Sequence, residues 1–503
     1  MSQIFPFLDL PWAQGFAIAF TWEHLLILIM ASLLGVICGA LPGIGASLTM
    51  SLLIPFSFHW DKTTGLILLV GAWASAVYGG SITAILINTP GTGGNVASAF
   101  DGFPLSEQGR AGEALGISAF ASSIGGVTGI AFLIFFSPLL AKLTVEFGPA
   151  EYFIIGLLAL CMIAALSGAS LLRGLISGGL GLLISFMGYD IITGELRFNF
   201  GFEYLEERIH FVIIVIGVFG VSQCLRFSET VGSISRSGEV KGGYLSGVAT
   251  TLKYPFTLLR SVLIGIVFGF IPGLGTSSAS LFSWTEAKRV SKNSHAFGKG
   301  NPEGLVASEA ANNAVEGGAL TPTLTLGIPG NPNSAVFLAA MLMYGILPGQ
   351  QLYQQNSDLV STLFITLLLS QSVFFFTGWI VSLGAARVTT LSLTFLAPLI
   401  LLVCLTGAYV SSGQFGDVAV AVILGLVGYY MHRYKYSAVC LLLGVIIGPL
   451  TERNYHRAMI IYQDTWSIIT ASYISIALTV LLVVVLIWGG WRTLRSGKPS
   501  SPL

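Results

Sequence analysis

Four short segments combine glycine and proline with other small or polar residues, and each interrupts an apolar stretch. Their sequences are PGIG at 42–45, NTPGTGGN at 88–95, PGLGTSS at 272–278 and GIPGNPNS at 327–334. Proline inside a helix removes a backbone hydrogen bond and clashes with the preceding turn, whereas glycine allows a positive φ. We therefore expect each segment to break a helix.

A broken helix exposes backbone groups that can bind ions. The N–H groups at the start of the next half-helix carry a positive partial charge and bind anions without Lys or Arg. Carbonyl oxygens freed at the other end suit Na⁺. The predicted anion site consists of the breaks and the polar residues near them: Gly43, Ile44, Gly45, Asn88, Thr89, Pro90, Gly91, Thr92, Gly93, Asn95, Gly273, Gly275, Thr276, Ser277, Asn312, Asn313, Pro329, Gly330 and Asn331.

The densest polar stretch runs from 297 to 330. Within it Glu309, Asn312 and Asn313 fall at i, i+3 and i+4, on one face of a helix. One carboxylate with two amides suits cation coordination or hydrogen bonding to a substrate, and the alternative is a solvated helix whose Glu309 faces water. The predicted ligands of a coupling cation, with Na⁺ as the candidate ion, are Glu309, Asn312, Thr321 and Thr323. No other metal and no cofactor are expected.

The sequence carries no catalytic signature. It has no Ser/His/Asp constellation, Walker A loop or HExxH helix, and Gly43-Ile-Gly45 lacks the βαβ context of a nucleotide fingerprint. We expect a protein that is not an enzyme and does not hydrolyse ATP, so uphill transport would use an ion gradient. Isolated glycines such as Gly125, Gly126, Gly178 and Gly179 are interpreted as packing residues between helices.

The composition is that of a polytopic helical membrane protein. Of 503 residues, 54% are hydrophobic and 9% charged, whereas a soluble domain carries roughly 25% charge. Lys and Arg number 23, as do Asp and Glu, so no basic excess indicates nucleic acid. These values exclude a soluble enzyme, a nucleic-acid binder and a disordered regulator. At about 20 residues per crossing, the apolar runs predict roughly ten to twelve transmembrane helices in the lipid bilayer.

The apolar runs are continuous, which excludes β-barrel strands. They lie at 24–41, 63–87, 114–141, 151–168, 174–189, 209–225, 256–271, 357–384, 391–407, 417–431, 437–450 and 470–490. Three further stretches, 43–58, 273–285 and 319–347, are rich in Gly, Pro or Asn and are predicted half-helices or re-entrant loops.

The motifs occur twice along the chain. Gly39–Gly45 (GALPGIG) matches Gly269–Gly275 (GFIPGLG), and Pro90-Gly91 matches Pro329-Gly330. Further matches pair Gly79-Gly80 with Gly317-Gly318, Ser167–Ala169 with Thr406–Ala408 and Gly188-Tyr189 with Gly428-Tyr429. The spacing is nearly constant, which predicts a duplicated core.

Basic residues of the loops indicate the orientation of the two copies. Segment 226–260, the C-terminal tail and Arg433-Lys435 are predicted cytoplasmic, and the acidic loop 190–208 external. The loop after Pro90-Gly91 then lies inside and the loop after Pro329-Gly330 outside.

The predicted fold is an all-α polytopic membrane protein in two inverted repeats with broken or re-entrant helices, an architecture of many secondary transporters. The predicted domains are 1–23 (lead-in), 24–227 (first repeat), 228–255 (cytoplasmic linker), 256–451 (second repeat) and 452–503 (terminal helix and tail).

At these same motifs the sequence resembles a known family. GALPGIG (39–45), GGSITAILINTPG (79–91), FGPAEYF (147–153), GFIPGLGTSSAS (269–280) and the run from Phe297 to Gly330 are similar to the large membrane subunit of tripartite tricarboxylate transporters, the TctA type. The resemblance extends from about residue 20 to 490. One departure is Ser308, which stands where the family commonly has Pro before EAANNA.

The resemblance implies an all-helical carrier of the bacterial inner membrane, driven by a Na⁺ or H⁺ gradient. Its substrates would be small carboxylates, di- and tricarboxylates such as citrate. Its partners would be a small four-span membrane subunit and a periplasmic solute-binding protein. An organic-anion channel and a non-transporting membrane assembly subunit remain the alternatives.

Overall fold

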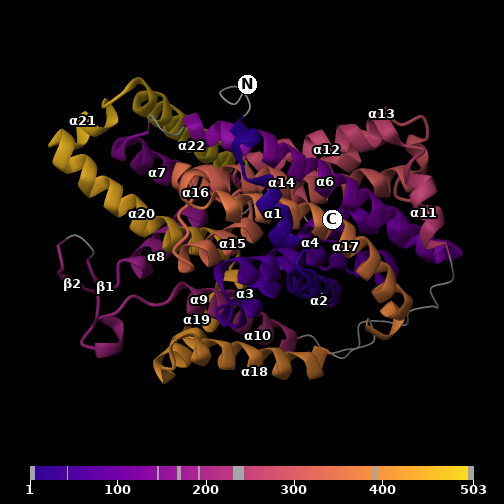
Figure 1. Cartoon of the computed structure of the whole chain (residues 1–503), viewed down its shortest axis with the longest axis horizontal. Coiled ribbons are helices and arrows are strands. Elements are labelled where there is room, and N and C mark those ends of the chain that lie inside the picture. Colours follow the sequence, from indigo (N-terminus) through magenta and orange to yellow (C-terminus); the bar gives the residue numbers. More distant parts are fainter. Residues whose placement is uncertain are drawn as a thin grey trace. The chain divides into compact units, whose positions relative to one another are not determined.

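The computed structural model describes residues 6–41, 43–143, 147–166, 171–190, 193–229, 243–388 and 393–496. Pro42, the motif at 167–169, part of the predicted linker (230–242) and the tail from 497 lie outside these ranges. The described residues are helical throughout, apart from loops and one antiparallel pair of short strands, β1 (Gly188–Tyr189) and β2 (Leu196–Arg197). The predicted all-α class is confirmed (Figure 1).

The helices fall into two compact units, each built from two stretches of the chain. The first comprises Met1–Lys142 and Gln223–Gly407, and the second Leu143–Ser222 and Ala408–Leu503. Each unit therefore contains parts of both predicted repeats, and all four predicted breaks lie in the first.

The first unit contains two similar series of helices. The early series is η1 (Pro6–Asp9), α1 (Trp12–Ala19), α2 (Trp22–Gly39), α3 (Ala46–Ser57), α4 (Lys62–Ile87), η2 (Gly93–Asn95), α5 (Val96–Leu105), η3 (Ser106–Arg110) and α6 (Ala111–Leu143). The late series is α11 (Tyr244–Thr251), α12 (Pro255–Phe270), α13 (Gly275–Val290), η7 (Ser294–Ala296), α14 (Pro302–Leu326), α15 (Pro332–Met343), α16 (Gln350–Gln355) and α17 (Ser357–Val388).

The second unit contains most of the remaining elements. The remaining helices are α7 (Pro149–Leu166), α8 (Leu171–Ser185), η5 (Glu203–Leu205), α9 (Phe211–Val215), η6 (Ile216–Val221), α10 (Ser222–Glu229), α18 (Leu393–Ser412), α19 (Phe415–Arg433), α20 (Ala438–Tyr462), α21 (Thr465–Ile469) and α22 (Tyr473–Ser496). The greater part of α10 and of α18 belongs to the first unit.

Fewer helices than the ten to twelve expected are long and apolar enough to cross a bilayer. Among the described residues there are five, or six if α11 and α12, bent by 87°, form one span. The five are Trp22–Gly39, Lys62–Ile87, Gly93–Lys142, Ser357–Leu383 and Phe415–Arg433. The predicted apolar runs do form helices, and among the described residues seven further apolar segments of 10–17 residues are helical.

The two series in the first unit repeat the same packing. A Cβ atom added at Gly79 of α4 would contact the carbonyl oxygen of Val36 in α2. One at Gly318 of α14 would contact the carbonyl oxygen of Ile266 in α12. Gly79 thus corresponds to Gly318, which corrects the sequence match with Gly317 by one residue. The duplication is visible in the packing, whereas the opposite membrane orientation of the copies stays a prediction.

Each series begins with a short helix that the predicted repeat boundaries left out. Helix α1 lies in the predicted lead-in and packs against α17, where Gly15 leaves no room for a side chain beside Ser361. Helix α11 lies in the predicted linker, and its Gly247 packs in the same way against Glu113 and Ile117 of α6. A short helix therefore precedes both α2 and α12.

The last helix of each series packs against the central helix of the other. A Cβ atom at Gly125 or Gly129 of α6 would overlap carbonyl oxygens of α14, and one at Gly378 of α17 would overlap the ring of Tyr78 in α4. The packing role predicted for Gly125 and Gly126 agrees with these contacts, whereas nothing lies within 4 Å of a Cβ at Gly179. The two copies are thus interlocked around α4 and α14.

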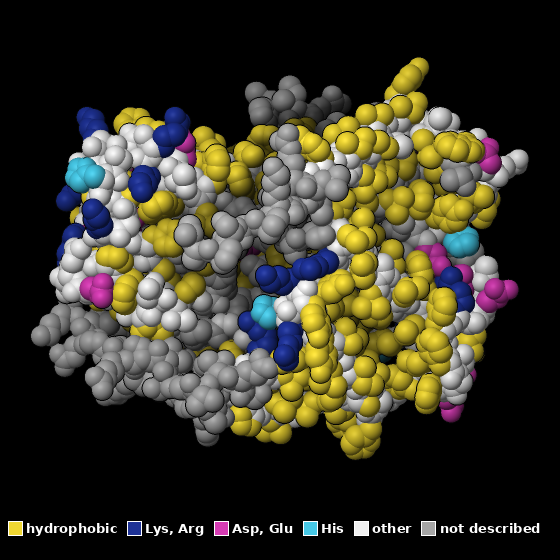
Figure 2. All heavy atoms as spheres, turned by 180° about the vertical axis from the view of Figure 1, so that it is seen from behind, with side chains coloured by type: hydrophobic (Ala, Val, Ile, Leu, Met, Phe, Trp, Pro, Cys, Tyr) yellow, Lys and Arg dark blue, Asp and Glu magenta, His cyan; other side chains and the backbone are white. Residues whose placement is uncertain are grey.

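Hydrophobic side chains cover much of the surface (Figure 2). Helix α12 shows why, because one face exposes Phe256, Leu259, Leu263 and Val267 while Gly265 on the other packs against α14. Large exposed apolar faces of this kind are stable in contact with lipid rather than water.

Helix α14 is buried along most of its length, although its sequence is polar. Its N-terminus is anchored by Asp101 of α5. One carboxylate oxygen accepts hydrogen bonds from the backbone N–H groups of Gly298, Gly300 and Asn301 at 2.8, 3.1 and 2.8 Å, and the other accepts from the indole N–H of Trp284 at 2.7 Å. Gly298 and Gly300 have φ of +81° and +96°, so the glycines of the FGKGN loop allow it to wrap the carboxylate.

Replacing Asp101 by Ala should destabilise the protein, because four donors would lose their buried acceptor. We expect the free energy of unfolding to fall by about 3 kcal/mol or more. The measurement is thermal unfolding of purified protein, with Glu107→Ala, an exposed acidic residue of the following turn, as the matched control. Equal melting temperatures for D101A and E107A would contradict the anchoring role.

Candidate functional site

In each series the two helix breaks are hydrogen-bonded to each other. Gly43, with φ of +85°, donates its N–H to the carbonyl oxygen of Gly91 at 3.3 Å. Gly273, with φ of +90°, donates to the carbonyl oxygen of Gly330 at 3.1 Å. Both donors adopt a left-handed conformation that favours glycine, so the paired PG motifs are explained by one repeated backbone contact.

A helix begins after each of the four breaks, as the sequence predicted. Helix α3 starts behind Gly45, α13 starts at Gly275, and η2 leads into α5. Helix α15 has a capping box, in which the side chains of Asn331 and Ser334 each accept from the backbone N–H of the other.

The breaks of the two series also contact each other. Gly93 in η2 lies so close to Ser277 of α13 that a Cβ atom would overlap the Ser277 hydroxyl. At the opposite pair, the hydroxyl of Ser47 in α3 donates to the side-chain oxygen of Asn333 in α15 at 2.6 Å. Together with the two backbone bonds, these contacts join all four breaks in a closed ring, which we call the break ring: 43–47, 91–95, 273–277 and 329–334.

Part of the break ring is accessible. Gly43, Gly93 and Ser277 are exposed, whereas Pro329, Gly330 and Asn331 are buried. Most of the predicted anion-site residues are thus brought together, and the exposed Gly93 and Ser277 lie where η2 meets the N-terminus of α13.

Two of the predicted asparagines have local structural roles. Asn88 ends α4 in the left-handed conformation, with φ of +53°, as Gly327 ends α14 with φ of +70°. The buried amide of Asn95 donates to the carbonyl oxygen of Val77 and to the hydroxyl of Ser81, and accepts from Thr92. The hydrogen-bonding groups of Asn95 are therefore already occupied by the protein.

Glu309, Asn312 and Asn313 share one face of α14 and are 0%, 0% and 3% exposed. This burial rules out a solvated helix whose Glu309 faces water. One Glu309 oxygen accepts from the hydroxyl of Ser122 at 2.8 Å, and further hydroxyls surround the carboxylate from α4, α5 and α6: Ser81, Ser98 and Ser118.

Several polar atoms on this face of α14 have no hydrogen-bond partner among the described residues. They are the second carboxylate oxygen of Glu309, both amide atoms of Asn312 and the side-chain oxygen of Asn313. Buried polar atoms without partners are rare in native proteins, and Asn312 adjoins the break ring at Gly94. The face thus offers hydrogen-bonding groups to a ligand.

Thr321 and Thr323 do not join Glu309 in one cation site. Thr321 follows Glu309 by twelve positions in α14, which is about 18 Å along the helix axis. Both threonine hydroxyls donate to backbone carbonyls one turn earlier. The predicted set of four cation ligands is therefore divided by the length of α14.

Sequence reasoning missed Glu316, the next charged residue on this face. Its two carboxylate oxygens accept hydrogen bonds from the side-chain amides of Asn331 and Asn333, each at 2.9 Å. Glu316 follows Glu309 by seven residues, two helical turns, so the same spacing rule that grouped Glu309 with Asn312 and Asn313 could have found it.

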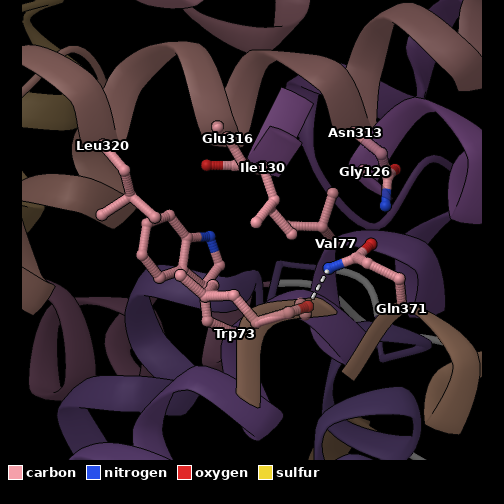
Figure 3. A pocket seen from close by; sticks show the side chains of 11 residues that line it. Trp73, Val77, Gly126, Ile130, Asn313, Glu316, Leu320 and Gln371 are labelled. Atoms are coloured by element: carbon pink, nitrogen blue, oxygen red, sulfur yellow. Dashed lines mark hydrogen bonds between the residues drawn. The ribbon is translucent and has the colours of Figure 1, made fainter. Parts of the chain in front are cut away.

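A small cavity lies beside Glu316 and Asn313 (Figure 3). Its volume is about 20 Å³, and its lining combines apolar side chains with Trp73 of α4 and Gln371 of α17. Helices of both series therefore form its wall. A cavity of this size holds one water-sized particle.

The second unit contains one group of potential metal ligands among the described residues, Asp190, Glu452 and His456. Arg197 pairs with Glu452 at 2.7 Å and with Asp190 at 3.3 Å. Its hydrogen bond to Glu452 and the nearby carboxylates raise the pKa of Arg197 above its usual value. The arginine thus balances the carboxylates, and we do not assign a metal there.

The contact between breaks predicts that Gly330 tolerates no side chain. A Cβ atom would lie 2.5 Å from the carbonyl oxygen of Gly269 and 2.8 Å from Ala319 Cα, so Gly330→Ala should separate α12 from the break after α14. We expect membrane insertion to persist while solute uptake is lost and the melting temperature falls. Gly179→Ala, whose Cβ meets nothing within 4 Å, is the control, and unchanged uptake by G330A would contradict the role of the break ring.

Comparison with known proteins identifies relatives over nearly the whole chain. The family described as "Tripartite tricarboxylate transporter TctA family" matches residues 25–443. An uncharacterized 52.8 kDa protein of Agrobacterium vitis, from the TAR-I ttuC' 3' region, is 33% identical over 487 residues, which are 94% of this chain and 95% of that protein.

A second protein of Agrobacterium vitis, uncharacterized and from the TAR-II ttuC' 3' region, is 30% identical over 240 residues, 46% of this chain and 97% of that protein. No solved structure matches the chain.

Proposed function

Because this chain belongs to the TctA family of tripartite tricarboxylate transporters, we propose that it is the large membrane subunit that carries small organic anions across the bacterial inner membrane. The family is one of transporters and not of enzymes, and the apolar helices make the chain a multi-pass membrane protein. The proposed substrates are di- and tricarboxylates such as citrate, imported by secondary active transport with a Na⁺ or H⁺ gradient.

The break ring is the observation that carries the proposal. It gathers helix N-termini around an accessible point, and its segments contain no Lys or Arg. N–H groups and the helix dipole at such ends favour negative charge. Irregular backbone is tolerated at membrane depth only where it is buried in protein or lines a wet cavity, so the ring suits a carboxylate-binding site.

The accessible side of the ring supplies the proposed contacts. A substrate carboxylate would accept hydrogen bonds from backbone N–H groups near Gly93 and from Thr276 and Ser277 at the start of α13. The side-chain nitrogen of Asn312, which has no hydrogen-bond partner among the described residues, would donate another. Alternating access would then move one set of repeated elements against a scaffold.

The proposed partners follow from the tripartite family. A periplasmic solute-binding protein would deliver the anion, and a small four-span membrane subunit would complete the carrier. Substrate choice could then reside partly in the delivered protein, so the experiment must include all three components.

Reconstitution tests the proposed activity directly. Proteoliposomes containing the complete carrier should take up labelled dicarboxylates or tricarboxylates with saturation, and uptake should collapse when the Na⁺ and pH gradients are both removed. A panel of acids with and without each gradient identifies substrate and ion. Uptake that ignores both gradients and does not saturate would support an anion channel instead.

A negative charge at the α13 N-terminus should compete with the substrate. Ser277→Asp places a carboxylate where helix N–H groups stabilise it, so the fold should persist while KM for the acid rises at least about tenfold through like-charge repulsion. Thr285→Asp, exposed and eight residues further along α13, serves as the control. Equal KM values for S277D and T285D would place the substrate elsewhere.

A further inference from the structure

The cavity beside Glu316 is lined by polar atoms that the protein leaves unsatisfied. The side-chain oxygens of Asn313 and Gln371 have no hydrogen-bond partner among the described residues, and the indole N–H of Trp73 faces the Glu316 carboxylate. These three side chains are 3%, 4% and 2% exposed. Figure 3 shows Trp73 and Glu316 on one side of the cavity and Asn313 and Gln371 on the other.

The orientation of Gln371 is fixed by its own hydrogen bonds. Its side-chain nitrogen donates to the carbonyl oxygen of Leu367 and to the hydroxyl of Ser370, both at 3.2 Å. The amide oxygen is therefore the atom available on the cavity side. Gly126 of α6 makes room for it, because a Cβ atom there would overlap this oxygen.

The lining has the chemistry of a site for a hard monovalent cation. Carboxylate and amide oxygens are the ligands that hard cations prefer, and the lining contains no thiolate or imidazole. A single carboxylate balances one positive charge, whereas a divalent ion would leave a net charge in an apolar enclosure. The volume of about 20 Å³ admits one ion without a water shell.

We propose that this cavity is a Na⁺ site formed by Glu316, Asn313 and Gln371, and that its occupancy is coupled to the break ring. The coupling rests on the proposed transport function, whereas Na⁺ binding itself does not. Glu316 lies between the two places, because its carboxylate also holds Asn331 and Asn333 at the N-terminus of α15.

The physical link is electrostatic. Without a cation, the Glu316 carboxylate opposes a substrate anion at the ring, and the low dielectric of the interior strengthens this repulsion. A bound Na⁺ cancels the charge and fixes the two asparagines, and Asn333 also accepts the hydrogen bond from Ser47 of α3. Bound Na⁺ should therefore raise the affinity for the substrate anion, and bound substrate should raise the affinity for Na⁺ by the same factor.

Binding can be measured on the purified chain without substrate or partners. NaCl replaces choline chloride at constant ionic strength, and the readouts are the melting temperature and tryptophan fluorescence, since Trp73 lines the cavity. We expect saturable effects of Na⁺ that equal concentrations of K⁺ do not reproduce. Trp73→Phe should remove the fluorescence change while keeping most of the thermal shift.

Variants of α14 and α17 test the assigned ligands. Glu316→Gln and Gln371→Ala should each raise the apparent dissociation constant of Na⁺ more than about tenfold. The matched control is Glu303→Gln on the same helix, whose carboxylate bonds Thr257 and Ser291 away from the cavity, and it should bind Na⁺ normally. Circular dichroism checks that each variant is folded, and Q371A keeps the test valid if E316Q fails to fold.

Two results would overturn the proposal. One is the absence of any Na⁺-specific effect. That result would mean either that the cavity holds water or that only protons bind to the Glu316 carboxylate, and repeating the choline series at two pH values distinguishes these two cases. The other is loss of Na⁺ binding in Glu309→Gln but not in E316Q, which would assign the Na⁺ site to Glu309, two helical turns earlier in α14. Normal Na⁺ binding with no carboxylate uptake would instead contradict the proposed transport function alone.

Discussion

Backbone hydrogen bonding at the helix breaks is the constraint on which the rest of the structure depends. In apolar surroundings an unpaired N–H or carbonyl group is costly. In this chain the breaks hydrogen-bond to each other in pairs: the backbone N–H of Gly43 donates to the carbonyl oxygen of Gly91, and that of Gly273 donates to Gly330. Each PG motif therefore needs its partner about 50 residues away, and the four breaks cannot be understood one at a time.

Glycine at helix contacts makes this pairing possible. The carbonyl groups of α4 and α14 approach Gly39 and Gly269 so closely that a Cβ atom would overlap them. Because α6 packs against α14 and α17 against α4, the two series interlock instead of forming separate domains. The polar face of α14 is consequently enclosed by helices from both halves of the chain.

That enclosure gives α14 its proposed role. Its two glutamates occupy different surroundings: Glu309 lies among serine hydroxyls, and Glu316 bonds the asparagines at the start of α15. In the early series, the position corresponding to Glu316 is Val77 of α4, since Gly79 corresponds to Gly318. The two series share their helix packing, whereas the glutamates of α14 are present only in the late series. An ion-coupled carrier would use this asymmetry.

The sequence by itself determined the helical class, most apolar helices to within a few residues, the breaks and their repetition. These properties are local, because proline and glycine act on their own turn and burial in lipid follows from composition. It also grouped Glu309 with Asn312 and Asn313, since helical spacing fixes a common face.

Only the tertiary structure decided which breaks meet, that Asn95 is already satisfied, and that Thr321 lies too far along α14 to share an ion with Glu309. It also revealed the cavity, because Trp73, Glu316 and Gln371 come from three helices that are distant in sequence. Side chains from separate helices converge through packing, and the spacing of residues along one helix carries no information about its neighbours.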